Sequence, residues 1–386
     1  MDVIIVGGGI AGLYTAYKIL ENDPKTSLLI IESDKLGGRI GNELFHGERI
    51  VTGAGVGRKE KDVLLNKLLK ELKVPCTDFE SKRNYAKTIS CDTKTIFQLL
   101  KKQFKESPER ISFKEFVIPL LGNEMYNRFV TCVGFTDYEN EDAYETFFNY
   151  GFEDNFESWT AINIPWNVLI QKLLQKIGRR IRFARVTKIT QKTNIIIRTD
   201  DGEYECKKLV IATEINSLQK LLPFPIYKQI RGQPFLRVYG KFSKASTEIM
   251  KQYVQGYTIV PGPLQKIIPM GGVYMIAYSD NHRAKILKKY LKNTIKNRDY
   301  FCRLIEKSLG IQESLHLIDM KDYYWETGTH YFEPLSGFKT RVDFIKQAQS
   351  PSPNIRVVGE LISTNQGWVE GALESVESIK KWLHNI

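Results

Sequence analysis

The feature that most constrains this chain is a glycine-rich turn near its N-terminus, placed between an apolar run and a helical pattern. Residues 3–6 read V-I-I-V, a continuous apolar run of the kind found in a parallel strand buried on both faces. The turn that follows reads G-G-G-I-A-G over residues 7–12, and the pattern after it predicts a helix to about Leu20. Strand, glycine turn and helix in this order predict a Rossmann-like unit.

Each glycine of this turn has its own physical role. Gly7 permits the tight turn, Gly9 lets the backbone approach a pyrophosphate, and Gly12 lets the helix pack closely on the strand. The helix N-terminus offers free N–H groups and a partial positive charge to an anion. Glu32 follows the second predicted strand, Leu28–Ile31, where a carboxylate accepts ribose hydroxyls and disfavours a 2′-phosphate. The sequence therefore predicts a site for NAD or FAD, and not for NADP.

Further motifs at both ends of the chain bear on the choice of dinucleotide. A G-G-R motif lies at residues 37–39, and I-V-T-G-A-G lies at residues 50–55. Near the C-terminus, a predicted strand over Ile355–Val358 is followed by G-E at 359–360 and by G-W-V-E-G-A at 367–372, where a helix is predicted to begin. In their order and spacing these blocks resemble the flavin-containing amine oxidase family, which includes monoamine, polyamine and L-amino-acid oxidases. The resemblance is strong at both ends and weak in the middle.

The resemblance implies an α/β, two-domain flavoprotein with a Rossmann-like FAD-binding domain and an α+β substrate domain of mixed sheet and helices. The FAD-binding domain would comprise residues 1–58, 165–234 and 336–386, and the substrate domain residues 59–164 and 235–335. Besides the turn and Glu32, the implied FAD-binding positions are Gly38, Arg39, Gly53, Ala54, Val186, Gly359, Glu360, Gly367, Trp368, Val369 and Ala372.

The resemblance also implies a reaction in which a hydride moves from the α-carbon of an amine to flavin N5. Where the family commonly has a lysine near N5, this chain has Arg237, and an arginine stays charged and cannot relay a proton. Oxygen reactivity is therefore open. Trp368 matches one wall of the family's aromatic cage, but the second wall falls on Gly328 and the cysteine that bonds flavin falls on Thr327. These positions predict non-covalent FAD and a differently built cage, with His330 as a further site candidate and no metal.

Three functions are compatible with these residues. The first is an FAD-dependent amine oxidase or dehydrogenase that acts on an amine or amino acid and passes electrons to oxygen or another acceptor. The second is a desaturase-like or porphyrinogen-oxidase-like flavoprotein, whose site would need a wide apolar tunnel. The third is a catalytically weak FAD-binding protein with a structural or interaction role. Reduction of the flavin by amines would separate the first from the third.

The net charge and the distribution of apolar residues restrict the classes of binding partner that we expect. Lys plus Arg is 56 against 44 for Asp plus Glu, a net charge of +12, which could reflect nucleic acid or another anionic surface. The lysines are dispersed and not interleaved with aromatic residues, so nucleic-acid binding is not predicted as the main function. No apolar run approaches the roughly 18 residues of a membrane helix, and no leader precedes the first strand. We therefore expect a soluble, intracellular protein.

The five cysteines are scattered and form no C-x-x-C pair. We therefore expect buried thiols, with a disulfide as the main alternative. In the middle of the chain, the spacing of apolar residues predicts a helix over Leu64–Leu72, a β-rich segment over Ile181–Ile189 and one helix over residues 283–309.

Overall fold

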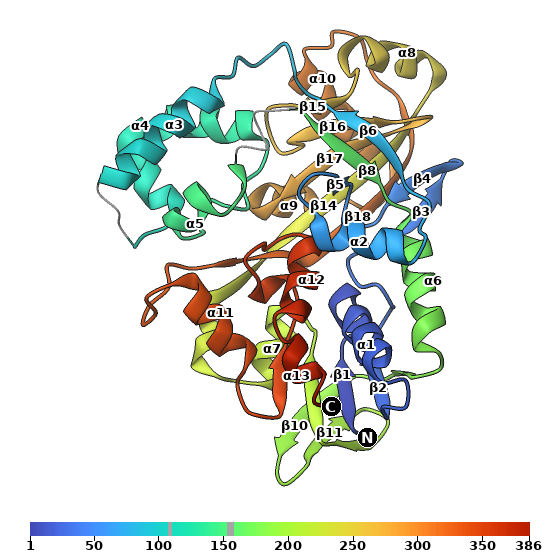
Figure 1. Cartoon of the computed structure of the whole chain (residues 1–386). Coiled ribbons are helices and arrows are strands. Elements are labelled where there is room, and N and C mark those ends of the chain that lie inside the picture. Colours follow the sequence, from blue (N-terminus) through green and yellow to red (C-terminus); the bar gives the residue numbers. More distant parts are fainter. Residues whose placement is uncertain (107–109, 153–157) are drawn as a thin grey trace.

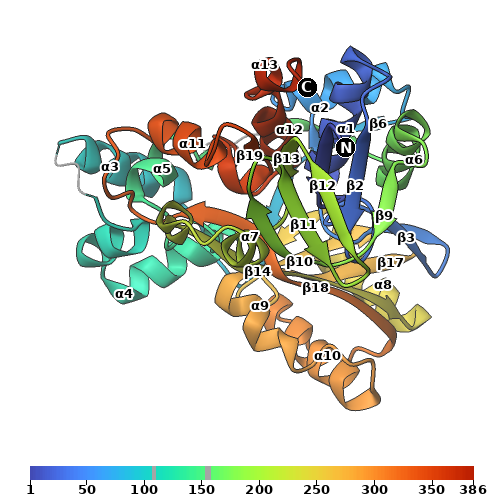
Figure 2. The same cartoon turned by 90° about the horizontal axis from the view of Figure 1, so that it is seen from below.

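The computed structural model describes residues 1–106, 110–152 and 158–386. The chain forms two sheet-based halves and a lobe of helices that projects beside them (Figure 1). Both termini lie at the half that carries the parallel sheet, so the beginning and the end of the chain build the same part of the molecule (Figures 1 and 2).

A five-stranded parallel sheet is the centre of this first half, with the order β19-β13-β1-β2-β9. Its strands are β1 (Val3–Val6), β2 (Leu28–Glu32), β9 (Ile181–Phe183), β13 (Lys208–Ile211) and β19 (Ile355–Val357). Strand β1 lies between β13 and β2 and is buried along its whole length, as its four apolar residues predict.

Alternate residues of β1 support different layers, because successive side chains of a strand point to opposite faces. Val3 and Ile5 pack under three helices: α1 (Ile10–Asn22), α6 (Trp166–Ile177) and α12 (Val369–Glu377). Ile4 and Val6 face a second layer that contains an antiparallel sheet. That layer comprises β10 (Val186–Gln191), β11 (Ile195–Thr199), β12 (Glu203–Cys206), α7 (Ile215–Leu221) and α11 (Arg341–Gln349), and Figure 2 shows it from below. The predicted Rossmann-like layering is confirmed.

The second half contains a six-stranded mixed sheet in the order β18-β14-β17-β16-β15-β7. Its two longest strands, β14 and β18, form an antiparallel pair that extends toward the parallel sheet (Figure 1). The strands are β7 (Arg83–Tyr85), β14 (Ile230–Phe242), β15 (Tyr257–Ile259), β16 (Lys266–Met270), β17 (Val273–Asp280) and β18 (Leu317–Phe332). Helices α8 (Lys244–Tyr253), α9 (Asn281–Lys288) and α10 (Ile295–Leu309) accompany this sheet.

Shorter elements complete the fold. They are the hairpin of β3 (Asn42–Phe45) and β4 (Glu48–Val51), the sheet of β5 (Gly57–Arg58), β8 (Trp159–Asn163) and β6 (Thr77–Ser81), the helix α2 (Val63–Glu71), the single turn η3 (Glu360–Ile362) and the terminal helix α13 (Lys380–Leu383). The helix predicted over Leu64–Leu72 is confirmed as α2.

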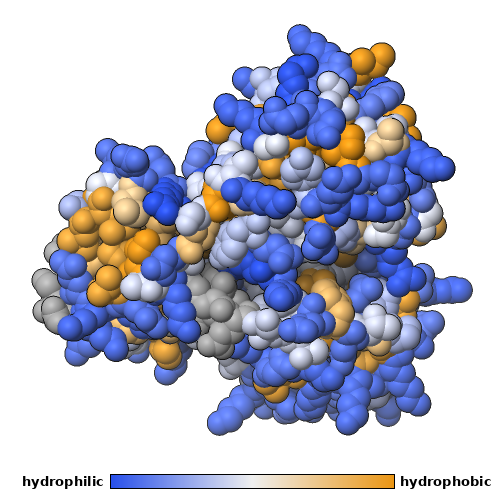
Figure 3. All heavy atoms as spheres, turned by 90° about the horizontal axis from the view of Figure 1, so that it is seen from above, coloured by the Kyte–Doolittle hydropathy of each residue, from blue (hydrophilic) through white to orange (hydrophobic). Residues whose placement is uncertain are grey.

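The projecting lobe consists of α3 (Thr93–Glu106), α4 (Phe113–Val133) and α5 (Ala143–Phe148). Its core is a cluster of buried aromatic rings that includes Phe104, Phe113 and Phe147. Figure 3 shows the lobe standing apart from the main body, with apolar side chains gathered on its upper surface. No helix in residues 1–106, 110–152 and 158–386 combines the length and apolarity needed to cross a membrane.

Two predictions from sequence periodicity are wrong in detail. The single helix predicted over residues 283–309 is two helices, α9 and α10, because Thr294 caps a new helix by accepting a hydrogen bond from the Asn297 N–H. The single segment predicted over Ile181–Ile189 is divided between β9 and β10, which belong to different sheets. Since β2 ends at Glu32, β9 has no parallel partner beyond that point and the chain turns away.

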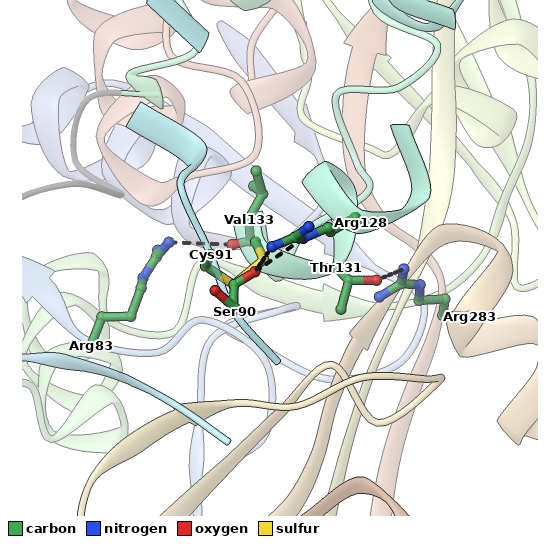
Figure 4. Close-up of a disulfide and its surroundings, with 8 residues drawn as sticks. Arg83, Ser90, Cys91, Arg128, Thr131, Val133 and Arg283 are labelled. Atoms are coloured by element: carbon green, nitrogen blue, oxygen red, sulfur yellow. Dashed lines mark hydrogen bonds between the residues drawn. A yellow bond between two sulfur atoms is a disulfide. The ribbon is translucent and has the colours of Figure 1, made fainter. Parts of the chain in front are cut away.

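The prediction of thiols at all five cysteines is also wrong for one pair. Cys91 and Cys132 form a disulfide, with their Cα atoms 5.5 Å apart and a sequence separation of 41 positions. The segment that carries Cys91 runs along the C-terminal turn of α4, where Arg128 donates hydrogen bonds to the Ser90 carbonyl (Figure 4). Sequence spacing could not reveal this approach, because only the packing of the segment on α4 creates it.

We expect loss of this disulfide to lower stability substantially. Closing a loop of this length in the unfolded chain corresponds to about 4 kcal/mol in the chain-entropy description. The double variant Cys91→Ser/Cys132→Ser should therefore melt at a lower temperature than the parent protein, and a reductant should lower the melting temperature of the parent alone. Cys76→Ser, which removes a half-buried free thiol, is the control and should leave the reductant effect intact. Equal melting temperatures with and without reductant would contradict this expectation.

Candidate functional site

A single cavity joins the two halves of the molecule, and both ends of the chain line it. The glycine turn near the N-terminus and the block at residues 359–372 lie together on its wall. Of the positions predicted from sequence, those on its wall are Gly7, Gly9, Glu32, Gly38, Arg39, Gly53, Ala54, Val186, Arg237, Gly359, Glu360, Gly367, Trp368, Val369 and Ala372. Gly12 and His330 are not among the residues that line it.

The glycine turn has the geometry expected of a phosphate-binding loop. Gly7 has φ of +108°, a conformation that side chains rarely adopt. A Cβ on Gly12 would lie 2.0 Å from the Gly7 carbonyl oxygen, so Gly12 brings the helix close to the strand and needs no contact with the cavity. A Cβ on Gly9 would meet no atom within 4 Å, because this backbone faces the open cavity. No side chain caps α1, so its first N–H groups remain available to an anion.

Glu32 holds the turn and also borders the cavity. Its Oε2 accepts a hydrogen bond of 2.6 Å from the Gly8 N–H, and its Oε1 accepts one of 2.8 Å from the Asp34 N–H. A carboxylate oxygen has more than one lone pair, so both oxygens can accept further bonds from a ligand. The side chain is thus fixed in the place where ribose hydroxyls were predicted to bind.

Glu360 is the centre of the network that joins the two sequence ends. Its Oε1 accepts hydrogen bonds from Arg39 Nη1 at 2.7 Å and from His330 Nδ1, and its Oε2 accepts one from the Gly367 N–H at 2.8 Å. Burial alone would raise the pKa of Glu360, but His330 and Arg39 together lower it to about 2. The carboxylate therefore stays charged and fixes Arg39 against the cavity.

His330 supports this network from behind. Its Nε2 accepts a hydrogen bond from the Ile215 N–H at the start of α7, so Nδ1 carries the proton that it donates to Glu360. The imidazole is 3% exposed and does not reach the cavity wall. The side chain of Glu214, to which the sequence assigned no role, caps the same helix by accepting from the Asn216 and Ser217 N–H groups.

Arg237 lies on the cavity wall with its guanidinium held on several sides. Its Nε–H donates to the Gly53 carbonyl at 2.6 Å, and the guanidinium carbon lies 4.3 Å from the centroid of the Tyr278 ring. A Cβ on Gly55 would lie 3.1 Å from its Nη2, so the cation is packed against the backbone block at residues 53–55. The side chain is 2% exposed and cannot readily move.

The structure shows what occupies the space beside Gly328, the position at which the resemblance would place a second aromatic wall. A Cβ at Gly328 would lie 2.1 Å from the Cβ of Phe235, so Phe235 fills the space that a tyrosine at position 328 would need. The Phe235 and Tyr278 rings meet edge to face at 5.1 Å, and both line the cavity. Trp368 lines it as well, and its Nε1–H donates to Asp62 Oδ2 at 2.8 Å.

Sequence reasoning missed a group of residues that line the cavity from the second half of the molecule and from the loop after α4. These residues are Phe135, Asp137, Phe235, Tyr278, Asp280 and Trp325. They come from the loop after α4 and from three different strands, and none belongs to a recognisable motif. Their meeting depends on how the helical lobe packs against the six-stranded sheet, so no sequence signal marked them.

The residues of this cavity fit a dinucleotide such as FAD. The Gly9 backbone is open to an approaching pyrophosphate, and Arg39 and the N-terminus of α1 provide positive charge beside it. Within the described ranges, the buried hydroxyls of Thr213 and Thr329 have no hydrogen-bond partner although both residues line the cavity. Buried hydroxyls are normally satisfied, so their position here favours a polar ligand.

Comparisons with known proteins agree with this architecture. A family model described as an NAD(P)-binding Rossmann-like domain matches residues 5–72. An uncharacterized protein of Acanthamoeba polyphaga mimivirus is 21% identical, and the match spans 98% of this chain and 93% of that protein. Putrescine oxidase bound to putrescine superposes with a TM-score of 0.77 at 16% identity, over 100% of this chain and 99% of its own.

A protein named as a protoporphyrinogen oxidase from an Exiguobacterium species superposes with a TM-score of 0.72 at 13% identity, over 100% of this chain and 98% of its own. Both superpositions cover the whole chain. The predicted α/β fold, with a Rossmann-like part combined with mixed sheet and helices, is thereby confirmed.

Proposed function

We propose that this protein is an FAD-dependent oxidoreductase of the amine oxidase type, which oxidises an amine or amino acid at its α-carbon. The observation that carries the proposal is one continuous cavity, whose wall includes both the dinucleotide turn and Arg237, Phe235 and Tyr278. Active sites of flavoenzymes need this continuity, because the reacting atom of the cofactor and the substrate must share one water-excluded space.

Each part of the chain has a distinct role in holding FAD. Glu32 and Val186 would bind the adenosine, and the N-terminus of α1 with Arg39 would bind the diphosphate. Glu360 and the N-terminus of α12 would bind the ribityl part. The backbone at Gly53, Ala54 and Gly55 would lie along the flavin. We propose non-covalent binding, since Thr327 lies on the wall and no described cysteine lines the cavity.

When bound, FAD would supply the acceptor for the hydride that leaves the amine carbon. The protein's own contribution is electrostatic and steric. Arg237 would place a fixed positive charge beside the flavin, which favours the negative charge gained on reduction. Because a guanidinium cannot relay a proton, we leave the electron acceptor as either oxygen or another oxidant. Phe235, Tyr278 and Trp368 would form apolar walls that orient the substrate.

Polar residues on the cavity wall favour an amine over a lipid or tetrapyrrole. A desaturase or porphyrinogen oxidase needs a wide apolar tunnel, whereas this wall carries Arg237, Asp137 and Asp280. The fold is shared by putrescine oxidase and by the protein named as a protoporphyrinogen oxidase. We therefore propose the amine reaction and use protoporphyrinogen as a test of the alternative.

Anaerobic reduction of the purified protein tests this function directly. We expect a yellow protein whose visible flavin absorbance is lost when an amine from a panel of putrescine, benzylamine, spermidine and L-leucine is added. Peroxide formation on admission of air, compared with reduction of an artificial acceptor, separates an oxidase from a dehydrogenase. Loss of colour with protoporphyrinogen alone, or with no compound, would refute the proposal, and a colourless protein that takes up no FAD would refute its premise.

A further inference from the structure

Asp137 is a cavity residue that no motif marks and that the FAD site does not use. It lies in the loop after α4, where its main-chain carbonyl accepts a hydrogen bond of 2.7 Å from Gln233 Nε2 of strand β14. Its side-chain Oδ1 accepts one of 2.5 Å from the Tyr150 hydroxyl. Among the described residues, no hydrogen-bond donor is directed at Oδ2, and the side chain is only partly buried on the wall of the cavity. The carboxyl group is thus held in place with one oxygen left for a ligand.

The neighbouring carboxylate, Asp280, is occupied in a different way. It is 2% exposed, and its Oδ1 accepts hydrogen bonds from the Thr136 N–H at 3.0 Å and from Gln265 Nε2 at 2.9 Å. The Thr136 hydroxyl donates to the same oxygen. Asp280 therefore has a structural role in joining β17 to the loop of Asp137, and its negative charge acts on Asp137 from nearby.

Lys266, the lysine near Asp137 and Asp280, forms no ion pair with either carboxylate. Lys266 Nζ is buried behind the rings of Phe135 and Tyr278, 3.1 Å and 3.9 Å from their centroids, and has no hydrogen-bond partner in the described part of the chain. Burial lowers the pKa of Lys266. The two rings separate its amine from the cavity, so a ligand would meet the carboxyl of Asp137 and not this amine.

These surroundings set the proton affinity of Asp137. Burial and the charge of Asp280 raise the pKa of Asp137 to about 7, against the lowering effects of the Tyr150 hydrogen bond and Lys266. The titratable groups that act on it from the packed elements are Tyr138, Glu141, Tyr150, Lys266, Tyr278 and Asp280. A carboxyl group that titrates near neutral pH suits proton transfer, because a general base works best when its pKa lies close to the working pH.

Amine oxidation requires such a group on chemical grounds. An aliphatic amine has a pKa of about 10 and is an ammonium ion at neutral pH. A hydride can leave its α-carbon only when the nitrogen lone pair is free to form the carbon–nitrogen double bond of the product. Arg237 cannot take the ammonium proton, and Glu360 is held charged by His330 and Arg39 at the other part of the cavity.

We propose that Asp137 is the catalytic base that takes the proton of the substrate ammonium through Oδ2. This assignment rests on the proposed function and deepens it, because it defines the substrate as a cationic amine. In the step, one N–H bond of the ammonium breaks and an O–H bond forms on Asp137, which leaves a neutral amine and a neutral carboxyl group. When bound, FAD would supply the acceptor for the hydrogen and the two electrons of the α-C–H bond, and the amine would be left as an iminium ion. Asp137 afterwards loses its proton to solvent.

The test compares the rate of anaerobic flavin reduction across pH in the parent protein and in three variants, with putrescine and benzylamine as probes. In the parent, the reduction rate at low amine concentration should rise with pH through about 7, as Asp137 loses its proton. In Asp137→Asn the rate at neutral pH should fall roughly 100- to 10,000-fold, the usual contribution of a general base. The deficit should shrink toward pH of about 10, where the amine is neutral in bulk solution.

Two further variants separate catalysis from structure. Tyr150→Phe removes a hydrogen bond that favours the charged carboxylate, so the rise in rate should move to higher pH. Asp322→Asn is the matched control, because burial also raises the pKa of Asp322 but its side chain does not line the cavity. Its pH profile should equal that of the parent. An unchanged profile in Asp137→Asn would overturn the assignment.

Stability provides an internal check that the Asp137→Asn variant is folded. A carboxyl group whose pKa is raised on folding contributes stability that is complete below its unfolded pKa of 3.8 and that is lost as pH rises through about 7. Asparagine escapes this loss, so the variant should melt at a higher temperature than the parent at pH 8. A rate loss with a lowered melting temperature would identify misfolding and would overturn the interpretation of that variant as a missing base.

Failure of the proposed function would be recognised separately. If no compound of the panel of putrescine, benzylamine, spermidine and L-leucine reduces the flavin of the parent protein, the proposed function fails. The change in the spectrum of the oxidised flavin on adding putrescine then tests Asp137 alone. Putrescine binding that strengthens through pH 7 in the parent but not in Asp137→Asn supports recognition of the cation by this carboxylate, whereas equal binding in both proteins overturns it.

Discussion

Gly9→Val should strongly weaken FAD binding in a protein that still folds. Gly9 has φ of −69° and ψ of 179°, an extended conformation that valine adopts easily, and a Cβ there would touch no protein atom. The added methyl groups would instead occupy the space in which the diphosphate approaches the backbone. Steric insertion into a tightly filled site costs about 1–3 kcal/mol, which corresponds to a roughly 10- to 100-fold weaker dissociation constant. Titration of FAD into the apoprotein measures the loss.

Gly12→Ala is the matched comparison for Gly9→Val, because in the same turn it should lower the stability of the fold. Its Cβ would lie 2.0 Å from the Gly7 carbonyl oxygen, so the helix and strand would have to separate. We expect Gly12→Ala to lower the melting temperature, whereas Gly9→Val should leave the melting temperature of the apoprotein unchanged. Unimpaired FAD binding by a folded Gly9→Val protein would place the dinucleotide elsewhere.

Glu360→Ala should weaken both the fold and the hold on FAD. The change leaves Arg39 without its ion-pair partner and removes the acceptor for His330 and for the Gly367 N–H. Breaking a buried charge pair costs about 3–5 kcal/mol, and since Arg39 remains 30% exposed the lower figure of about 3 kcal/mol applies. We expect this loss of unfolding free energy in chemical denaturation, together with a lower FAD content after purification.

The effect of Glu360 should also depend on pH in a defined direction. Its pKa falls from 4.5 to about 2 on folding, so the charged carboxylate contributes stability above pH 4.5 that is lost as pH falls toward 2. The difference in stability between the parent and Glu360→Ala should therefore shrink over this range. Glu203→Ala, which removes an ion pair exposed on the surface, is the control and should change stability by less than about 1 kcal/mol. A difference that stays constant down to pH 2 would show that Glu360 is not the group responsible.

The parts of the site that could be predicted from sequence are those whose expected role depends on the backbone. The roles of Gly7, Gly9 and Gly12 could be predicted one by one, because each glycine meets a steric requirement that its neighbours set. The structure places Gly7 and Gly9 on the cavity wall and Gly12 at the contact between helix and strand. The roles assigned to these residues, to Arg39 and to Arg237 in binding and catalysis stay predictions until a ligand is measured.

Other features depended on contacts between distant segments and could not be predicted. The disulfide forms because the segment before α3 runs along the end of α4. His330, a site candidate from sequence, proves to lie behind Glu360, where it bonds the carboxylate and the start of α7. The absence of a cage tyrosine at Gly328 has a cause that is visible only in space, because Phe235 fills that volume.

The sequence by itself determined the dinucleotide half of this protein, because a phosphate-binding turn and a buried parallel strand restrict residue types within a short stretch of chain. Only the tertiary structure decided the substrate half. Asp137, Tyr278 and Asp280 meet there through the packing of a helical lobe on a mixed sheet. Their chemistry arises from burial and from each other's charge, and neither quantity exists until the chain has folded.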